Sequence, residues 1–327
     1  MGDLRIGILG AARIAPSALV RPAHQVDGVT VTAVAARDRA RAARFAERHG
    51  IGRVLDDYRA VIEDPDVDAV YVPLPNGLHA TWTLAAIAAG KHVLCEKPFT
   101  SNAAQAREVA DASAGSPVTV MEAFHYRYHP LAARMREIVD TELGAVSHVE
   151  TAMCIPLPRF SDIRYRYDLA GGALMDAGCY AVHAARLLGP GEPAVTGARA
   201  RVTGRDDRVD RAMTVDLSYP GGATGRVSTS LWSSSLLRIS ASVTGEHGEL
   251  RVLNFVAPQY PHRLTVRVRG RRRHERVRGE ASYTHQLRAF LAATRGEPTN
   301  RTPPADAVVT MAVVDAAYAA AGLPERS

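Results

Sequence analysis

Short apolar runs alternate with amphipathic segments over roughly the first third of the chain. Apolar runs bounded by turn residues are typical of buried parallel strands, and the segments between them are long enough for helices. The predicted strands are residues 4–9, 29–35, 54–55, 68–74, 92–95 and 118–121. The predicted helices are residues 14–20, 39–49, 57–62, 77–89 and 102–113. This alternation predicts the α/β class, with an N-terminal Rossmann doubly wound parallel sheet.

The pattern changes after about residue 122. Helices are predicted at residues 131–139 and 173–188, with a strand at 146–155 between them. Seven runs that alternate polar and apolar residues then follow, separated by turns such as Pro220-Gly221-Gly222. They are residues 196–202, 213–219, 225–231, 239–244, 249–253, 264–268 and 273–277. Successive strands without helices between them predict a C-terminal α+β domain with a large, open-faced, mainly antiparallel sheet.

Two further helices are predicted at residues 283–294 and from about 304 to Gly322. We therefore expect three parts. Residues 1–121 form a dinucleotide-binding Rossmann domain, and residues 122–301 form a substrate-binding and oligomerisation domain. Residues 302–327 form a C-terminal helix that could pack back on the first domain. The broad second sheet could serve as a subunit interface, which favours a homo-oligomer, a dimer or a tetramer.

Composition excludes several classes of protein. The 327 residues are 46% hydrophobic and 23% charged, as in water-soluble globular proteins, and no apolar run is long enough to span a membrane. Cys95, Cys154 and Cys179 show no metal-binding spacing, so we expect free thiols, no metal and a cytoplasmic protein. The basic excess of +6 lies partly in the run 267–278, where no aromatic residue is interleaved. That run indicates an exposed strand rather than a nucleic-acid site.

Lysine is rare in this chain. Of the 40 basic residues, only Lys91 and Lys97 are lysines, and the other 38 are arginines. Arginine stays protonated in proteins, whereas the pKa of a lysine shifts readily when the residue is buried or flanked by cations. Each lysine is therefore a candidate for chemistry that arginine cannot perform. Lys91 follows Gly90 at a predicted helix end, where a cation offsets the helix dipole, so that role suffices for it.

The turn after the first strand carries a partial dinucleotide fingerprint. A G-x-G-x-x-G/A motif would run from Gly10 to Ala15, with Ala12 in place of the second glycine. The alternative is a plain tight turn, but the position between the first strand and the first helix favours a pyrophosphate site. The cofactor-binding residues expected here are Gly10, Ala11, Ala12, Arg13 and Ile14.

The end of the second strand indicates which nucleotide binds. An NAD site requires a carboxylate there for the ribose hydroxyl, whereas an NADP site requires an arginine for the 2′-phosphate. Ala36 occupies the acidic position and Arg37 follows it, which favours NADP over NAD. The alternative is that Arg37 is one of many solvated arginines and that Asp38 caps the next helix while also reaching the ribose.

Two more candidate segments follow the fourth and fifth strands. In an open α/β sheet, ligands bind at the carboxyl ends of the strands. The fourth strand leads into Pro-Leu-Pro-Asn-Gly-Leu-His at 73–79, and the fifth ends in Cys-Glu-Lys-Pro at 95–98. The expected cofactor-binding residues in these segments are Leu74, Pro75, Asn76, His79, Glu96 and Lys97.

These motifs, together with Gly-Gly-Ala-Leu-Met-Asp-Ala-Gly-Cys-Tyr at 171–180, resemble the glucose–fructose oxidoreductase/inositol dehydrogenase (Gfo/Idh/MocA) family in order and spacing. The resemblance implies a Rossmann domain followed by an open-faced sheet domain, with Lys97 as a catalytic group beside the nicotinamide. It also implies that the residues around Pro75, Asn76 and His79 touch cofactor or substrate.

One departure from the family pattern narrows the resemblance. Much of the family has Asp-x-x-x-His on the helix that opens the second domain, whereas this chain has Asp176 and Tyr180. A tyrosine there is similar to dimeric dihydrodiol dehydrogenases, NADP-dependent xylose dehydrogenases and sugar 3-ketoreductases. Asp176, Tyr180 and His183 share one face of the predicted helix. Packed, locally bonded side chains are the alternative interpretation for Tyr180 and His183, and the more fitting one for His183.

We therefore expect an NADP-dependent oxidoreductase that transfers hydride to or from a carbohydrate or related diol. Tyr180 would move the proton, Lys97 would lower the pKa of Tyr180, and Asp176 would hold Lys97 or a sugar hydroxyl. Glu122, Arg164 and His183 are the further substrate-pocket candidates. Two alternatives are a non-catalytic, cofactor-sensing regulator on the same fold and a redox-assisted glycosidase with tightly bound nucleotide.

Overall fold

The computed structural model describes residues 2–327, which form two compact units. The first unit comprises the chain up to Thr100 together with Ala104–Tyr128 and Ala281–Val308. The second comprises Ser101–Ala103, His129–Glu280 and Val309–Ser327. Both units are discontinuous in sequence and so differ from the three continuous ranges expected above. The predicted packing of the last helix on the first domain stays a prediction.

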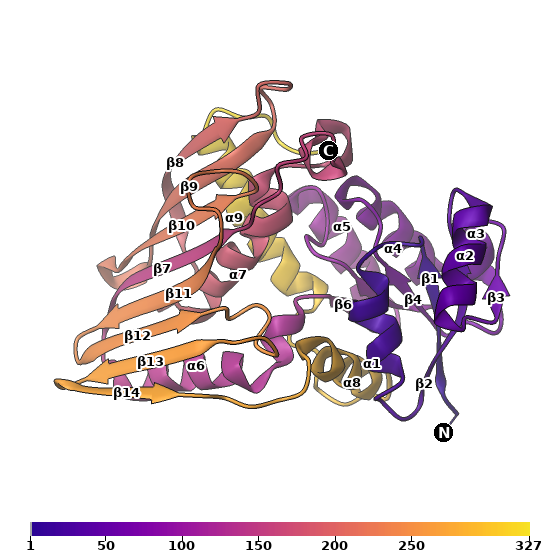
Figure 1. The fold of residues 1–327 in the computed structure, drawn as a ribbon, viewed down its shortest axis with the longest axis horizontal. Helices are drawn as coiled ribbons and strands as arrows, with labels where there is room; N and C mark the ends of the chain where they lie inside the picture. The colour runs from indigo at the N-terminus through magenta and orange to yellow at the C-terminus, as the bar shows by residue number, and fades with distance from the viewer. Residues whose placement is uncertain (1) are drawn as a thin grey trace. The chain divides into compact units, whose positions relative to one another are not determined.

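The first unit contains a six-stranded, all-parallel sheet in the order β3-β2-β1-β4-β5-β6 (Figure 1). Its strands are β1 (Leu4–Leu9), β2 (Val29–Ala35), β3 (Arg53–Val54), β4 (Ala69–Val72), β5 (His92–Cys95) and β6 (Val120–Glu122). The strand order reverses direction between β1 and β4, which is where doubly wound sheets bind their ligands. The predicted Rossmann sheet is confirmed.

Helices connect these strands. They are the π-helical turn η1 (Pro16–Val20), α1 (Arg21–Ala23), α2 (Arg39–His49), α3 (Tyr58–Glu63), the 3₁₀ turn η2 (Asn76–Leu78), α4 (His79–Ala88) and α5 (Ala103–Ala114). The side chain of Asp38 accepts a hydrogen bond from the backbone of Arg41 and so caps α2. Asp57 caps α3 in the same way, and Gly50 ends α2 in the left-handed conformation.

The helix that follows the second sheet in sequence, α8 (Ser282–Thr294), packs into the core of the first unit. Its buried residues Leu287, Phe290 and Leu291 join the cluster that contains Ile6 and Ile8 of β1. Because the apolar stripe of a helix shows only that the helix packs on something, the sequence did not predict which unit would receive α8.

The second unit contains an eight-stranded sheet in the order β14-β13-β12-β11-β7-β10-β9-β8. Its strands are β7 (Val146–Cys154), β8 (Ala194–Val202), β9 (Asp210–Ser218), β10 (Thr224–Ser230), β11 (Arg238–Gly245), β12 (Gly248–Leu253), β13 (Arg263–Val268) and β14 (Arg271–Glu275). All pairs are antiparallel except β7 with β10, where Val149 lies opposite Gly225. The predicted, mainly antiparallel sheet is confirmed, with the early strand β7 inserted at its centre.

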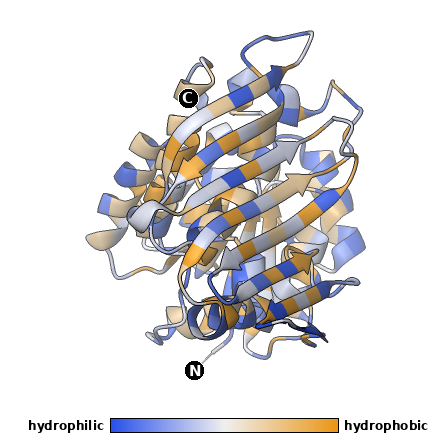
Figure 2. Ribbon diagram, turned by 90° about the vertical axis from the view of Figure 1, so that its left-hand side faces the viewer, coloured by the Kyte–Doolittle hydropathy of each residue, from blue (hydrophilic) through white to orange (hydrophobic). Residues whose placement is uncertain are grey.

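The helices of this region are α6 (Pro130–Glu142), the π-helical turn η6 (Leu174–Gly178), α7 (Cys179–Leu188) and α9 (Pro304–Ala320). Short 3₁₀ turns are η3 (His125–Tyr128), η4 (Ile163–Tyr165), η5 (Tyr167–Leu169) and η7 (Pro220–Gly222). Helix α7 packs against the central strands β7, β10 and β11, and α6 packs against β12. Among residues 2–327, no helix of this unit covers the opposite face of the sheet, and its strands show mixed polar and apolar positions (Figure 2).

Candidate active site

The turn after β1 has the backbone shape that a dinucleotide cradle needs. Gly10 has a φ of +106°, and a Cβ atom there would lie 3.0 Å from Leu74 Cδ2. Both the dihedral and the close approach therefore require glycine. The Gly10 N–H donates to the Ala35 carbonyl at 2.7 Å, and the Ala12 N–H donates to the Gly10 carbonyl at 2.8 Å. The structure thus brings the predicted cofactor residues Gly10, Ala12 and Leu74 together at one edge of the sheet.

Basic side chains lie beside this turn, at the end of β2. Arg37 is exposed, and Arg41 in the first turn of α2 donates from its guanidinium to the Ala11 carbonyl at 2.7 Å. Burial raises the pKa of the Tyr58 hydroxyl, and the positive charges of Arg37 and Arg41 oppose that rise, so both guanidiniums lie near Tyr58. Arginines placed next to a glycine turn suit a phosphate of the bound nucleotide.

Arg41 and Tyr58 were missed by sequence reasoning. Arg41 is four residues after Arg37, but only the packing of α2 against the Gly10 turn makes it a candidate. The capping role predicted for Asp38 is present, because one of its carboxylate oxygens accepts from the Arg41 N–H at 3.0 Å.

His79 is fully buried and ties two candidate loops together. Its Nδ1 lies 2.7 Å from the Pro98 carbonyl oxygen, and its Nε2 lies 2.8 Å from the Leu74 carbonyl oxygen. Burial lowers the pKa of His79, and the charge of Lys97 lowers it further. The ring therefore bridges the Leu74 loop to the loop that carries Lys97. This placement gives His79 a structural contact to both loops, and the cofactor contact expected of it stays a prediction.

Two buried glutamates lie near the loop of Lys97: Glu96 directly before it in sequence, and Glu122 at the end of β6. Glu96 accepts from the Tyr71 hydroxyl at 2.7 Å, and Glu122 accepts from the Phe99 N–H at 2.9 Å. Their bonds hold the β5 and β6 loops to the sheet. Glu122, expected to line a substrate pocket, thus supports the Lys97 loop in this structure.

A buried histidine, His125, lies close enough to Lys97 for the two side chains to interact electrostatically. Burial, and then the charge of Lys97, lower the pKa of His125 to about 3. The Nδ1 of His125 lies 2.8 Å from the Ser282 hydroxyl, and its ring stacks on Tyr283 with centroids 3.9 Å apart. Because His125 is uncharged at neutral pH, it places no positive charge beside Lys97.

The second unit supplies the other candidates from η6 and α7. Asp176 lies in η6, while Tyr180 and His183 are buried on α7. Arg164 donates to Asp176 at 2.7 Å and to Asp162 at 3.1 Å, and these two carboxylates raise its pKa, Asp176 most strongly. Asp176 is therefore paired with Arg164 within this unit. Lys97 belongs to the first unit, so its meeting with Tyr180 is part of the proposal below.

Two features that would indicate other functions are absent from residues 2–327. Over residues 2–327, no group of three or more His, Cys, Asp or Glu side chains is arranged to hold a metal ion. Within the same residues, no helix has the length and apolar character needed to cross a membrane.

Comparison with known proteins also divides the chain into a Rossmann domain and a C-terminal domain. The family described as oxidoreductase family, NAD-binding Rossmann fold, matches residues 4–124, and the GFO/IDH/MocA C-terminal domain matches residues 132–251. D-xylose 1-dehydrogenase (NADP(+)) 2 of Haloferax volcanii is 40% identical over 319 residues, which is 97% of each chain. Trans-1,2-dihydrobenzene-1,2-diol dehydrogenase of Mus musculus is 35% identical over 266 residues, covering 78% of this chain and 76% of that protein.

Solved structures of known proteins have a fold similar to that of this chain. KijD10, a 3-ketoreductase from Actinomadura kijaniata in complex with NADP and TDP-benzene, superposes with a TM-score of 0.89 at 30% identity, over 98% of both chains. The predicted relationship to xylose dehydrogenases, dihydrodiol dehydrogenases and sugar 3-ketoreductases is thereby confirmed. The two matched regions and the full-length relatives show that the chain is an oxidoreductase of the GFO/IDH/MocA family.

Proposed function

We propose that this chain is an NADP(H)-dependent oxidoreductase whose substrate is a carbohydrate or a related diol. The observation that carries the proposal is the carboxyl edge of the first sheet. There a glycine turn, two arginines and the loop of Lys97 converge on the ligand-binding side of a Rossmann unit. The relatives named above, which act on sugars or diols, support the substrate class.

The first unit fits a dinucleotide. The Gly10 turn leaves room that a side chain would fill, and the N-terminus of the following helix suits the pyrophosphate. Arg37 and Arg41 hold the 2′-phosphate, which selects NADP(H) over NAD(H). Lys97 and the loop at Pro75 and Asn76 flank the nicotinamide. When bound, the cofactor supplies or accepts the hydride.

The residues of the chain handle the proton that accompanies the hydride. The hydroxyl of Tyr180 gives a proton to the carbonyl oxygen in reduction, or takes it from the carbinol oxygen in oxidation. The Lys97 ammonium hydrogen-bonds the same oxygen and lowers the pKa of Tyr180, because a nearby cation favours the phenolate. His79 and Glu122 hold the Lys97 loop in place through their bonds to Leu74, Pro98 and Phe99.

The ion pairs of Arg164 support a polyol site in the second unit. Its guanidinium is fixed by Asp162, which caps η4, and by Asp176 in η6, so donors and carboxylate oxygens are preorganised together. Such an array suits the hydroxyls of a sugar. Solved structures of KijD10 include variants in which a tyrosine is replaced by phenylalanine, or a lysine by alanine or glutamate, each with NADP and TDP-benzene. Those variants identify tyrosine and lysine as side chains of interest in a similar protein.

The test is turnover of a panel of aldoses, keto-sugars and trans-diols, followed by the absorbance of NADPH. We expect net reduction or oxidation of at least one substrate, at a rate that falls sharply in Tyr180→Phe. Absence of turnover with tight nucleotide binding would favour the regulator. Glycoside cleavage without net change in the redox state of a copurified nucleotide would favour the redox-assisted glycosidase.

A further inference from the structure

A fully buried arginine lies in the segment that follows α9. The Arg326 guanidinium pairs with the carboxylate of Asp210 at 3.1 Å, and the Tyr318 hydroxyl donates to the same carboxylate oxygen at 2.9 Å. All three side chains are buried, and we call them the Arg326 cluster. Burying a charged pair costs several kcal/mol of desolvation unless hydrogen bonds compensate for it, so such a cluster calls for a reason beyond packing.

The guanidinium of Arg326 donates hydrogen bonds from its edge and stacks on an aromatic ring with its flat face. Its Nε donates to the Gly171 carbonyl at 2.8 Å and one terminal nitrogen donates to the Pro324 carbonyl at 2.8 Å. Its flat face lies over the ring of Tyr318, with Cζ 4.0 Å from the centroid. The Arg326 carbonyl in turn accepts from the Asn102 amide at 2.8 Å. A lysine ammonium could not satisfy the same partners, because it is neither planar nor forked.

The Arg326 cluster holds one turn of backbone, residues 171–174. Arg326 binds the Gly171 carbonyl, and the second carboxylate oxygen of Asp210 accepts from the Leu174 N–H at 2.8 Å. Between them Gly172 has a φ of +140°, and a Cβ atom there would lie 2.7 Å from the Tyr318 hydroxyl and closer still to Asp210. The turn therefore has a glycine, Gly172, at its contact with the cluster, and hydrogen bonds to the cluster at Gly171 and Leu174 on either side.

This turn supports two of the candidate substrate residues. The Gly172 N–H donates to the Arg164 carbonyl at 2.9 Å, and the Gly172 carbonyl accepts from the Asp176 N–H at 3.0 Å. The Arg164 and Asp176 side chains then pair with each other at 2.7 Å. The π-helical turn that begins at Leu174 continues into α7, which carries Tyr180. A shift of residues 171–174 would therefore move Arg164, Asp176 and Tyr180 together.

We propose that Arg326 is a positioning residue: with Asp210 and Tyr318 it fixes the 171–174 turn, and so sets the geometry of Arg164, Asp176 and Tyr180 for the reacting sugar. The proposal rests on the proposed function of those three residues. Because its side chain is fully buried, Arg326 acts through these residues and not through contact with sugar or nucleotide. Its removal should therefore weaken the sugar-dependent steps and leave binding of NADPH, which the first unit provides, unchanged.

The experiment compares Arg326→Ala and Arg326→Lys with a matched control, Arg208→Ala. Arg208 also stacks on a neighbouring tyrosine, Tyr167, at 4.3 Å, but it is exposed and paired with Asp206. We expect kcat/KM for the sugar to fall about 10- to 100-fold in Arg326→Ala, the scale of a small misplacement of catalytic groups. The Kd for NADPH should stay within about twofold of the wild-type value in Arg326→Ala. In Arg208→Ala, both kcat/KM for the sugar and Kd for NADPH should stay within about twofold of wild type. Added guanidinium, below denaturing concentration, should restore part of the loss in Arg326→Ala, and Arg326→Lys should recover little.

Hydrogen exchange separates this proposal from the proposed function. The amides of Gly172, Leu174 and Asp176 should exchange faster in Arg326→Ala than in the wild type or in Arg208→Ala. A folded Arg326→Ala enzyme with wild-type kcat/KM would overturn the proposal. If the wild type turns over no sugar, the proposed function fails, and unchanged exchange at these amides would then overturn the positioning role as well. Should Arg326→Ala not fold, Arg326→Lys is judged by the same two outcomes.

Discussion

At the scale of single residues, the two lysines have separate roles. The ammonium of Lys91 donates to the carbonyls of Asp64 at 2.8 Å and Val67 at 2.6 Å, so it closes a loop of the Rossmann unit. Lys97 instead follows β5 at the carboxyl edge, in a loop held by His79 and Glu122. The structural use of Lys91 is more specific than the helix-dipole role expected from the sequence. Lys97 is therefore the lysine for which we propose a catalytic role.

The proton relay predicts a pattern in kinetics. Lys97→Arg keeps the charge but replaces a compact ammonium with a longer planar group, and Tyr180→Phe removes only the hydroxyl. Each should lower kcat by about 10²–10⁴-fold, the range for general acid–base groups. Because the two side chains act on one oxygen, the double variant should fall little below the worse single variant. Steady-state kinetics with the best sugar substrate provide the measurement.

The same series carries its own control. Nucleotide binding and thermal unfolding should be unaltered in Tyr180→Phe, since only one oxygen atom is lost. Losses that multiply in the double variant would show that the two residues act independently. A near-normal kcat in Tyr180→Phe would remove the tyrosine from the relay and leave Lys97 or His183 as the candidate.

The arginines at the end of β2 predict the nucleotide preference. Replacing Arg37 or Arg41 by alanine should weaken binding of NADPH by roughly 1.5–3 kcal/mol, the worth of a hydrogen bond to a charged group. Binding of NADH, which lacks the 2′-phosphate, should barely change in Arg37→Ala and should fall less than binding of NADPH in Arg41→Ala, because Arg41 also bonds the Ala11 carbonyl of the glycine turn. Arg39→Ala is the matched control, because Arg39 lies between them in sequence and pairs with Asp56. Titration by fluorescence checks the prediction, and equal losses for both nucleotides would contradict it.

Among the helices and strands, the sequence predicts where each element begins and ends better than which other elements it packs against. The strands at 4–9, 29–35 and 92–95 and the helix at 39–49 have the bounds predicted for them, because burial and capping are local signals. The place of β7 beside β10 was not predictable, since alternation shows that a strand has a buried face but not which strand lies next to it. The unit that receives α8 was not predictable for the same reason.

The candidate site likewise contains residues that a sequence motif locates and residues that only the folded contacts reveal. The Gly10 turn and the Lys97 loop carry motifs, so the sequence located both. Arg41 and Arg326 carry no motif, and their roles arise from contacts with residues 30 and 155 positions away. His79 was located by its motif, but the motif could not show that both ring nitrogens face backbone carbonyls. Its burial, which only the fold reveals, adds a supporting contact to the cofactor role that remains a prediction.

An ion-pair network fastens the edge strand β14 to α6. Arg134 on α6 binds Glu275 at 2.8 Å, and Arg273 reaches both Glu275 and Glu142 at 2.7 Å. Hydrogen bonds from Arg134, and then from Arg273, lower the pKa of Glu275 to about 2. Edge strands are held by few backbone partners, so side-chain bonds to a helix protect β14 from fraying.

The lowered pKa predicts how acid affects this edge. A carboxyl whose pKa is depressed in the folded state stabilises the fold above its unfolded pKa and loses that contribution as the pH falls through the folded pKa. For Glu275 this window runs from about pH 4.5 down to about pH 2. Glu275→Gln should cost about 1–3 kcal/mol near pH 7, with the partial exposure of its partners keeping it near the lower value. The difference from the wild type in urea unfolding should vanish towards pH 2.

Glu249→Gln is the control for that measurement. Glu249 pairs with Arg251 at 2.5 Å on the same sheet, but the arginine is largely exposed, so the cost should be small at every pH. Equal and pH-independent costs for the two variants would show that the network does not secure β14.

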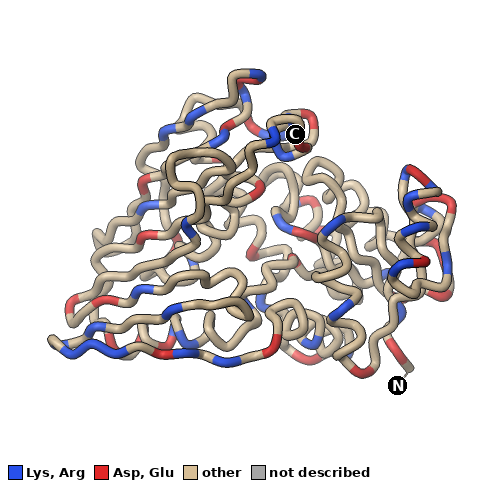
Figure 3. Tube along the Cα trace, viewed as in Figure 1, with Lys and Arg blue, Asp and Glu red and all other residues tan. Residues whose placement is uncertain are grey.

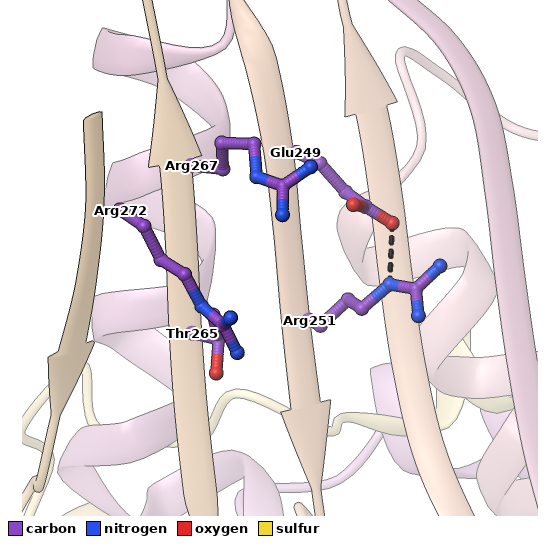
Figure 4. A pocket seen from close by; sticks show the side chains of 5 residues that line it. All are labelled: Glu249, Arg251, Thr265, Arg267 and Arg272. Carbon is purple, nitrogen blue, oxygen red and sulfur yellow. Dashed lines mark hydrogen bonds and ion pairs between the residues drawn. The ribbon is translucent and has the colours of Figure 1, made fainter. Parts of the chain in front are cut away.

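At the scale of the whole molecule, the helix-free face of the eight-stranded sheet is the surface to explain. Its central strands present short polar side chains and neutralised charges, such as Asp216 with Arg226 at 2.8 Å and Glu150 with Arg238 at 2.7 Å. Basic residues gather towards β13 and β14 (Figure 3). Here Arg251, Arg267 and Arg272 surround a shallow hollow together with Glu249 and Thr265 (Figure 4).

This face is where the predicted homo-oligomer would form, and that prediction allows a direct test. Ser242 lies at the centre of the face on β11, opposite Glu150 on one side and Arg251 on the other. A second copy stacked on the sheet would bury it, since stable dimers bury on the order of 1,200–2,000 Å² in all. Ser242→Arg would place a long, charged side chain in that interface and should convert the oligomer to monomers. Ala43→Arg, on the exposed side of α2 in the first unit, should leave the mass unchanged. Light scattering after size-exclusion chromatography gives the masses, and an oligomer that survives Ser242→Arg would show that subunits meet elsewhere.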